Sequence, residues 1–352
     1  MSLKVDIRKK FKGFSLDVSF ETDKEYIGLL GASGSGKSMT LKCIAGVETP
    51  DKGSIVLNGR VLFDSEKKIN LRPQERNIGF LFQNYALFPN MTVEENIGAG
   101  LKLPKKEKKI IVDDMIKTFH LQGLEKKYPG QISGGQQQRA ALARCIAYNP
   151  DMILLDEPFS ALDTHLKGQV QAEIFELLKL YDGEVLMVTH SMEEVYKFCR
   201  KLVIIDEGKS VLFGDTKEIF TEPKLVSAAR LTGCKNISGF SLISSDRIYA
   251  QDWGFEIKMN KFVSDAGFIG INSHCFEILE DFNSNNEENI IDCKVVEIIE
   301  MIQGYTIIFQ NKNSNISSSD MYLDVKKEMW DNRRNKNNLF LKIPESSVLL
   351  LK

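Results

Sequence analysis

The stretch GASGSGKS, residues 31–38, follows the apolar run YIGLL and precedes the helix-like run MTLKCIAG. It fits the pattern G-x-x-x-x-G-K-[ST] in the context that this pattern requires, a strand before it and a helix after it. Glycines at 31, 34 and 36 let the backbone curl, so that successive N–H groups and the helix N-terminus point at a phosphate. A flexible turn with a surface lysine is the alternative, and the flanking runs favour a nucleotide phosphate loop.

The chemistry of this pattern assigns a role to its last two residues. Lys37 is expected to reach the β- and γ-phosphates of the nucleotide, and the hydroxyl of Ser38 to bind Mg²⁺. The predicted nucleotide-binding residues of the loop are Gly31, Ala32, Ser33, Gly34, Ser35, Gly36, Lys37, Ser38 and Met39.

Two adjacent carboxylates end the apolar run MILLDEP, residues 152–158. Such a pair is costly at a buried strand end unless a cation lies beside it, and Mg²⁺ would supply that charge. Asp156 then suits the outer shell of the metal, while Glu157 points another way along the strand and can polarise the attacking water. The alternative is a strand end that surfaces into solvent with two hydrated acids.

A histidine follows another apolar run, in the sequence VTH at 188–190. Parallel strands deliver the residues at their ends to one shared edge of the sheet. This position favours contact between His190 and the γ-phosphate over a purely structural histidine.

A second glycine-rich stretch, ISGGQQQR, covers residues 132–139. Ser133 can cap the helix that follows, with Gln136 reaching back in a capping box. The same geometry exposes the amides of Gly134 and Gly135 at a positive helix end, so it can also hold a phosphate.

The composition is that of an ordinary globular chain long enough for two domains. Its 352 residues are 43% hydrophobic and 27% charged, with a net charge of −2 that lacks the basic excess of nucleic-acid-binding proteins. The six cysteines form no metal-binding or disulfide pattern. No apolar run reaches the roughly 18 residues of a membrane helix, and the N-terminus lacks the apolar core of a signal peptide.

The pattern of apolar and polar residues changes near residue 234. From about residue 3 to 232, short apolar runs alternate with helix-like stretches, the longest at 107–119 and 133–149, which predicts an α/β unit with a largely parallel sheet. After that, strand-like runs separated by Asn- and Ser-rich breaks predict a small all-β unit.

A lysine cluster lies between these features, within residues 102–109. Its members are Lys102, Lys105, Lys106, Lys108 and Lys109. The cluster can guide a partner or form a solvated helix face.

Taken together, these residues resemble the ATP-binding subunit of an ABC transporter of importer type. The resemblance rests on the phosphate loop 31–38, LFQNYALFPNMTVEENI at 81–97, ISGGQ at 132–136, ILLDEPFSALD at 153–163 and His190. These motifs occur in the family's order and cover residues 1 to about 232, with Ile132 where the family usually has leucine.

The resemblance implies a P-loop NTPase cassette over residues 1–233, with a helical subdomain at about 84–150. Residues 234–352 then form an OB-like domain of the TOBE/MOP type, of which the ending LFLKIPESSVLLLK is the clearest match. Two cassettes of the family pack head to tail, so each ATP lies between the phosphate loop of one copy and Ser133, Gly134, Gly135 and Gln136 of the other.

The resemblance also assigns single residues. Gln83 would contact Mg²⁺ or the attacking water, Glu157 would be the general base and Asp163 would cross the dimer interface. Phe11 is the first choice for stacking on adenine, and Phe14 the reserve.

The implied function is ATP hydrolysis that energises uptake through separate integral membrane permease subunits at the cytoplasmic face of the membrane. The resemblance also implies an extracytoplasmic substrate-binding protein as an indirect partner, and it implies no nucleic-acid partner. The stretches FSLDVSF and ARLTGCKN favour the molybdate and sulfate branch, hence an oxyanion cargo: molybdate, tungstate or sulfate. Polyamine, sugar or ferric-iron import, a soluble ABC ATPase acting on nucleic acid or ribosomes, and a nucleotide-gated regulator remain as alternatives.

Overall fold

The computed structural model describes residues 2–23, 25–160, 164–259, 266–279, 288–314, 319–331 and 339–352, and the side chains of these residues except 164–167. The chain divides into two compact units, residues 1–217 and 218–352. Each is described by itself, and the boundary expected between residues 233 and 234 stays a prediction.

Within its described residues, unit 1 is built on an eleven-stranded sheet with the order β6-β5-β4-β1-β2-β11-β10-β3-β9-β8-β7. The strands are β1 (Ser2–Phe11), β2 (Phe14–Asp23), β3 (Tyr26–Leu30), β4 (Lys52–Leu57), β5 (Arg60–Asp64), β6 (Ile69–Asn70), β7 (Ile78–Leu81), β8 (Met152–Asp156), β9 (Glu184–Val188), β10 (Lys201–Asp206) and β11 (Lys209–Asp215).

The predicted parallel sheet is confirmed for β10, β3, β9, β8 and β7, which pair in parallel register. β8 and β9 are buried at every position, as the continuous apolar runs in the sequence indicated. The prediction was incomplete for the other half. β1 pairs antiparallel with β2, and β4 with β5, because a two-residue turn joins each pair and leaves no room for a crossover helix. β1 also pairs antiparallel with β4.

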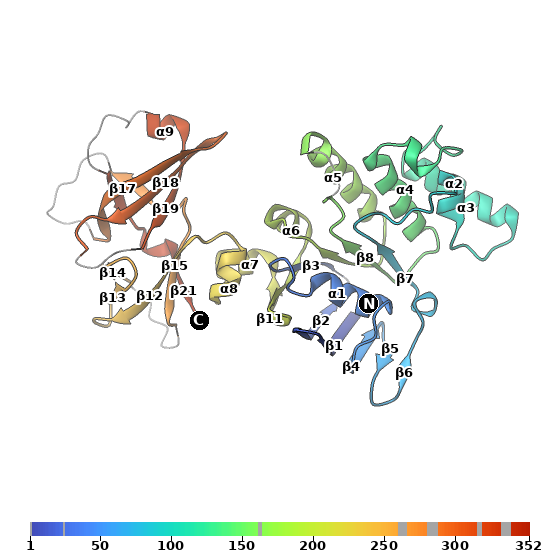
Figure 1. Ribbon diagram of the computed structural model, residues 1–352, viewed down its shortest axis with the longest axis horizontal. Coiled ribbons are helices and arrows are strands. Elements are labelled where there is room, and N and C mark those ends of the chain that lie inside the picture. Colours follow the sequence, from blue (N-terminus) through green and yellow to red (C-terminus); the bar gives the residue numbers. More distant parts are fainter. Residues whose placement is uncertain are drawn as a thin grey trace. The chain divides into compact units, whose positions relative to one another are not determined.

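Helices cover this sheet and extend beyond its β7 edge. They are α1 (Lys37–Ala45), α2 (Val93–Gly98), α3 (Lys105–Thr118), α4 (Gly134–Ile146), α5 (Thr164–Lys179) and α6 (Met192–Phe198). A further helix, α7 (Thr216–Thr221), contains the division between the two units. The predicted helices at 107–119 and 133–149 appear as α3 and α4, and α5 is longer than either. In Figure 1, α2, α3 and α4 gather on one side of β7, where α2 contacts both other helices.

Unit 2 contains two five-stranded sheets in its described part, with the orders β14-β13-β12-β15-β21 and β16-β20-β17-β18-β19. The strands are β12 (Asn236–Leu242), β13 (Arg247–Ala250), β14 (Phe255–Lys258), β15 (Phe268–Ile271), β16 (Glu277–Leu279), β17 (Ile290–Glu300), β18 (Gly304–Asn311), β19 (Met321–Lys326), β20 (Leu339–Lys342) and β21 (Val348–Leu351). Two short helices, α8 (Val226–Leu231) and α9 (Lys327–Asp331), accompany them.

The predicted small β unit is therefore confirmed, with α9 packed on β18 and β19 as an addition. One core, which includes Trp253, Ile307 and Leu341, joins residues of both sheets. Across the described residues of both units, no helix combines the length and the apolarity needed to cross a membrane.

Candidate functional site

The predicted site residues meet at one edge of the unit 1 sheet, where neighbouring parallel strands end. Gly31 directly follows β3, Gln83 lies two residues after β7, and Asp156 is the last residue of β8. His190 lies two residues after β9, which pairs with both β3 and β8. The carboxyl ends of parallel strands are the usual place for ligands in such sheets.

The phosphate loop has a shape that only glycine permits at two positions. A Cβ added at Gly31 would lie 2.2 Å from the carbonyl oxygen of Ile205. Gly36 has φ +104, and a Cβ there would lie 2.7 Å from the Leu16 side chain. This backbone curl aims N–H groups into the loop and delivers the chain into α1, as an anion site requires.

Lys37 begins α1, and its side chain extends back to the start of the loop. It is buried, and its Nζ donates hydrogen bonds of 2.8 Å to the carbonyl oxygens of Gly31 and Ala32. Burial lowers the pKa of this ammonium group, against the opposing influence of Glu157 and Asp156. The ammonium group is thus already positioned within the loop, and an anion bound there would favour its charged form.

Ser38 and Asp156 form a pair suited to a divalent cation. The Ser38 Oγ donates a 2.7 Å hydrogen bond to Asp156 Oδ1. Asp156 is 6% exposed, and burial raises the pKa of its carboxyl although the Ser38 hydrogen bond opposes that effect. A hydroxyl and a carboxylate are oxygen ligands of the kind that Mg²⁺ prefers, so the residues fit this ion.

Glu157 contacts the side chain of Gln83 and lies close to that of His190. The Gln83 Nε2 donates a 3.2 Å hydrogen bond to Glu157 Oε2, and the His190 Nδ1 lies 3.6 Å from the same oxygen. The backbone of Glu157 has φ +46, and its N–H bonds to the Val188 carbonyl oxygen at the end of β9. Strained backbone of this kind is held by its surroundings and is frequent at functional sites.

The helix after the second glycine stretch has the cap that the sequence indicated. Ser133 Oγ accepts from the backbone N–H of Gln136, and Gln136 Oε1 accepts from that of Ser133. This confirms the predicted capping box of α4. Gly134 and Gly135 begin the helix and leave its first amides directed outward.

Two further residues of α4 connect it to the site, and the sequence analysis missed both. Gln138 is fully buried, and its Nε2 donates to the Pro158 carbonyl oxygen, next to Glu157. The Arg144 guanidinium donates to the carbonyl oxygens of Tyr85 and Ala86, just after Gln83. No local sequence pattern predicts these contacts, because the bonded residues are 20, 58 and 59 positions apart in the chain.

The two aromatic candidates for adenine lie at the β1–β2 turn. Their ring centroids are 6.1 Å apart, and both side chains pack against the core of unit 1. Phe14 lies against the phosphate loop, since its Cζ would be 3.0 Å from a Cβ at Gly36. The Lys9 ammonium lies 5.2 Å from the Phe11 centroid. Asp163, predicted to cross a dimer interface, lies outside the described residues.

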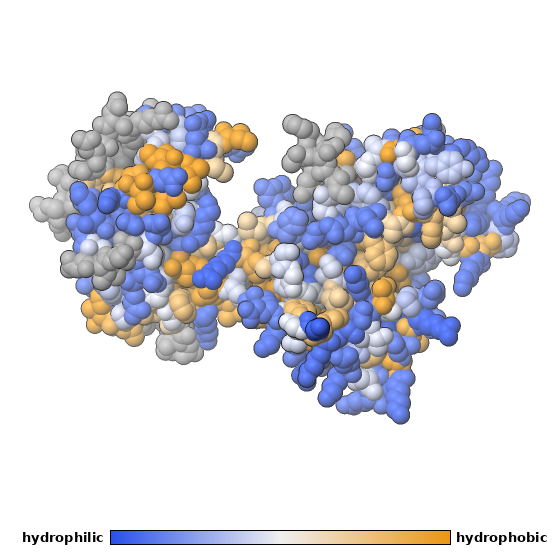
Figure 2. Space-filling model, in the orientation of Figure 1, coloured by the Kyte–Doolittle hydropathy of each residue, from blue (hydrophilic) through white to orange (hydrophobic). Residues whose placement is uncertain are grey.

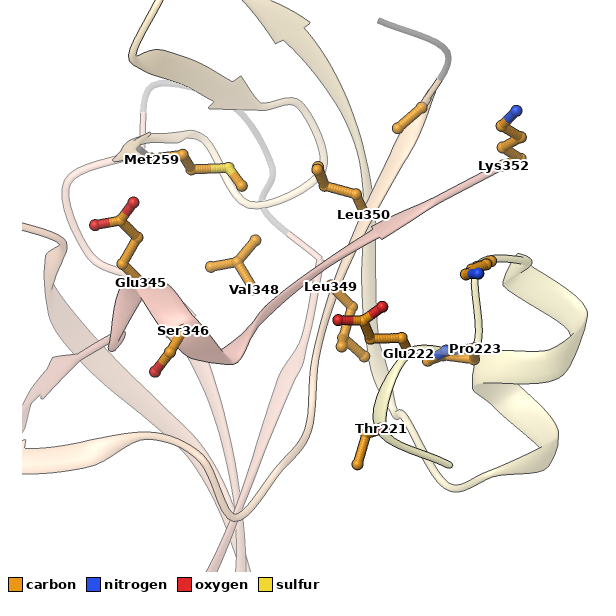
Figure 3. A pocket seen from close by; sticks show the side chains of 12 residues that line it. Thr221, Glu222, Pro223, Met259, Glu345, Ser346, Val348, Leu349, Leu350 and Lys352 are labelled. Atoms are coloured by element: carbon orange, nitrogen blue, oxygen red, sulfur yellow. The ribbon is translucent and has the colours of Figure 1, made fainter. Parts of the chain in front are cut away.

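Unit 2 has a cavity of its own, of about 1130 Å³ (Figure 3). Its lining includes Glu222, Lys224, Met259, Glu345, Leu350 and Lys352. Two glutamates and two lysines balance one another there, so the charge of the lining does not select for an anion.

Comparison with known proteins identifies the family. A sequence model of the family described as ABC transporter matches residues 13–160, which include the phosphate loop, Gln83, the second glycine stretch and Glu157.

Three relatives show how far the likeness extends. The spermidine/putrescine import ATP-binding protein PotA of Oleidesulfovibrio alaskensis is 41% identical over 60% of this chain, and the match spans only 56% of that protein. The Fe(3+) ions import ATP-binding protein FbpC of Haemophilus influenzae is 33% identical over 84% of this chain and 87% of its own. The molybdate/tungstate import ATP-binding protein WtpC of Methanocaldococcus jannaschii is 41% identical over 72% of this chain and 84% of its own.

Among solved structures, the dimeric ATP-binding cassette MJ0796 bound to ADP and Pi is similar. It aligns with a TM-score of 0.52 and 26% identity, covering 61% of this chain and 99% of that one. Fold, site and relatives agree, and the chain belongs to the ATP-binding, ATP-hydrolysing subunits of ABC importers.

Proposed function

We propose that this chain is the ATPase subunit of an importer for an oxyanion, namely molybdate, tungstate or sulfate. The observation that carries the ATPase part is the arrangement of Glu157 beside Gln83 and His190, at the edge that also holds the phosphate loop.

In this proposal the phosphate loop holds the nucleotide. Residues 31–39 surround the β- and γ-phosphates, and Lys37 exchanges its bonds to Gly31 and Ala32 for bonds to phosphate oxygens. Phe11, or Phe14 in its place, stacks on the adenine. The two rings are half-buried, so each can offer a face to a base.

Ser38, Asp156 and Gln83 are the residues that would hold Mg²⁺ at this site. The bound ion would supply charge that offsets the buried carboxylate and the phosphates. The Ser38 hydroxyl and Asp156 are already within 2.7 Å of each other, so they need little movement to share a ligand.

Glu157 acts as the general base for the attacking water. Its Oε2 accepts from Gln83, which orients the carboxylate. The His190 Nδ1 lies 3.6 Å from the same oxygen, and we expect this side chain to contact the γ-phosphate. Gln138 and Arg144 act as positioning residues. They tie α4 to the backbone next to Glu157 and Gln83, so a shift of α4 would reach both side chains.

The site is completed by a second copy of the chain. The residues Ser133, Gly134, Gly135 and Gln136 of that copy face the phosphates with the positive end of α4, and its Asp163 crosses the interface. The dimeric state of the similar cassette MJ0796 supports this arrangement.

The helical subdomain at about 84–150 connects the ATPase to the membrane. Integral permease subunits dock there, which places the chain peripherally on the cytoplasmic face of the membrane, and an extracytoplasmic binding protein delivers the cargo to those subunits. The contacts of α2, α3 and α4 with one another support a separate subdomain. Arg144 of α4 connects this group to Tyr85 and Ala86, which follow Gln83.

The oxyanion assignment is supported by the relative named for molybdate and tungstate, which combines 41% identity with 72% coverage of this chain. Ferric iron is the second candidate cargo. The relative named for Fe(3+) ions aligns over 84% of the chain, which is more than unit 1 alone can provide, so part of unit 2 is included.

The test measures accumulation of molybdenum, tungsten, sulfate and iron in cells at limiting supply. Native cells are compared with cells in which the chain carries Lys37→Ala, and with a matched strain carrying Lys52→Ala, an exposed lysine of β4. Loss of molybdenum, tungsten or sulfate uptake only with Lys37→Ala supports the proposal. Selective loss of iron uptake assigns the second cargo, and unchanged uptake of all four at normal protein levels refutes both.

A further inference from the structure

The lysine cluster has no role in the proposed ATPase site. It lies in the nine residues Lys102–Ile110, KLPKKEKKI, which we call the basic segment. The segment leads into α3 and forms its first turns, and it contains five lysines and one acid, Glu107.

The lysines of the basic segment are available to a partner. Lys102, Lys105, Lys106 and Lys109 are exposed, and Lys108 is half-buried. Among the described residues, none of the five forms an ion pair, whereas the nearby Lys126 pairs with Glu94. Figure 2 shows a mostly hydrophilic surface over α3, broken by hydrophobic patches.

Helix stability does not account for this charge. Four of the lysines occupy the first five positions of α3, where the helix dipole is positive and cations are unfavourable. Pro104 precedes the helix without a side-chain cap, so the first amides also point outward as donors. Acidic side chains would stabilise the first turn of a helix that only faces solvent. The positive charge of this turn is therefore best explained by an anionic partner.

Two exposed apolar side chains, Leu103 and Ile110, lie within the same segment. Leu103 is 41% exposed and Ile110 is 62% exposed. The segment is anchored below them, because Val112 and Ile116 are buried. Gly98 of α2 leaves room for the Lys108 stem, since a Cβ there would lie 2.6 Å from Lys108 Cε. An anchored helix end with ammonium groups and protruding apolar side chains matches the chemistry of a membrane interface.

We infer that the basic segment binds the anionic phospholipid headgroups of the membrane surface, with Leu103 and Ile110 entering the boundary between headgroups and acyl chains. This inference rests on the proposed function, which places the chain at a membrane. Lysine ammonium groups on flexible stems bind as point charges without fixed geometry, which suits mobile headgroups better than a single protein surface.

The test is sedimentation of the full chain with vesicles. Phosphatidylcholine vesicles are compared with vesicles that contain about 30% phosphatidylglycerol, at about 0.05 M and about 0.5 M salt. The test variant carries K102Q, K105Q, K106Q and K109Q. The matched control carries K52Q, K68Q, K294Q and K326Q, which remove the same charge from exposed lysines elsewhere.

We expect the native chain and the control to bind the anionic vesicles at low salt. The test variant should bind at least about tenfold more weakly, since each lysine near an anionic surface contributes severalfold. Adding Leu103→Ser and Ile110→Ser to the native chain should weaken the binding that survives high salt. Basal ATP hydrolysis should be unchanged in every variant, because none alters a site residue.

Three outcomes overturn the inference: no binding of the native chain to anionic vesicles, undiminished binding of the test variant, or an equal loss in the control. In a further case, the native chain fails to bind vesicles and yet associates with membranes that contain the permease. If the test variant loses that association, the partner is an acidic protein and the lipid inference is wrong. A chain that binds vesicles but hydrolyses no ATP would instead refute the proposed function alone.

Discussion

Glu184 is predicted to reduce the stability of unit 1 at neutral and alkaline pH. It begins β9 and is fully buried, with the Thr22 hydroxyl donating to one carboxylate oxygen. The other oxygen has no hydrogen-bond partner among the described residues. Burial raises the pKa of this carboxyl from 4.5 to about 7, and the Thr22 hydrogen bond opposes only part of that rise.

The direction of the pH effect follows from this pKa. Because the folded chain holds the proton more tightly than the unfolded chain, the favourable contribution of Glu184 is complete below pH 4.5 and is lost as the pH rises through about 7. At about 1.4 kcal/mol per pH unit, ionised Glu184 costs roughly 3 kcal/mol at pH 8. Glu184→Gln keeps the oxygen that accepts from Thr22 and cannot ionise, so it should recover most of this energy.

Urea unfolding at pH 8 and pH 4.5 measures the effect. Both tryptophans, Trp253 and Trp330, lie in unit 2, so their fluorescence reports that unit, while circular dichroism mainly follows the helices of unit 1. With a slope of about 2–3 kcal/mol per molar urea, the circular dichroism midpoint of Glu184→Gln should rise by about 1 M at pH 8. It should stay level with the native chain at pH 4.5.

Glu66→Gln provides the control, since Glu66 is exposed and should leave both midpoints in place. The reasoning about Glu184 is refuted if Glu184→Gln leaves the pH 8 midpoint unchanged, or if it raises the midpoint equally at both pH values. In the second case the substitution would improve packing without relieving an ionised carboxylate.

Three other substitutions test the site and its support. Glu157→Gln should lower ATP turnover by about 10²–10⁴-fold and leave nucleotide affinity intact, as phosphate release and equilibrium binding would show; normal turnover would remove Glu157 from the general-base role. Arg76→Met should lower the free energy of unfolding of unit 1 in urea by about 3 kcal/mol, because carbonyl oxygens at the end of α1 would lose the buried guanidinium as their donor. A loss of less than about 1 kcal/mol would contradict this. Asp156→Asn should leave the chain in EDTA at least as stable as the native protein, because burial raises the pKa of Asp156 and its ionised form is costly without a cation. The rise in thermal unfolding temperature caused by Mg²⁺ and ATP should be lost in this variant, and an undiminished rise would exclude Asp156 from the metal site.

The local sequence was sufficient for the parts of the site that are continuous in the chain. The phosphate loop could be predicted because its glycines, its lysine and the flanking runs all lie within residues 26–46. The capping box of α4 could be predicted because Ser133 and Gln136 are three residues apart, which fixes their geometry in any helix. The buried strands β8 and β9 could be predicted from unbroken apolar runs.

Tertiary structure alone decided the contacts between distant segments. Gln83 and Glu157 are 74 residues apart, and they meet because β7 pairs with β8 in parallel register. The same holds for Arg76, whose partners on α1 are 32 and 33 residues away, so no local pattern identified it as buried.

The sequence by itself thus determined the chemistry of this protein: a nucleotide loop, a carboxylate pair at a strand end and a second glycine-rich helix start, each specified by neighbouring residues. The structure decided which strand ends are neighbours and which charges are buried. Glu184 illustrates the difference, since its environment depends on Thr22, 162 residues away, and its raised pKa comes from burial that only the assembled sheet creates.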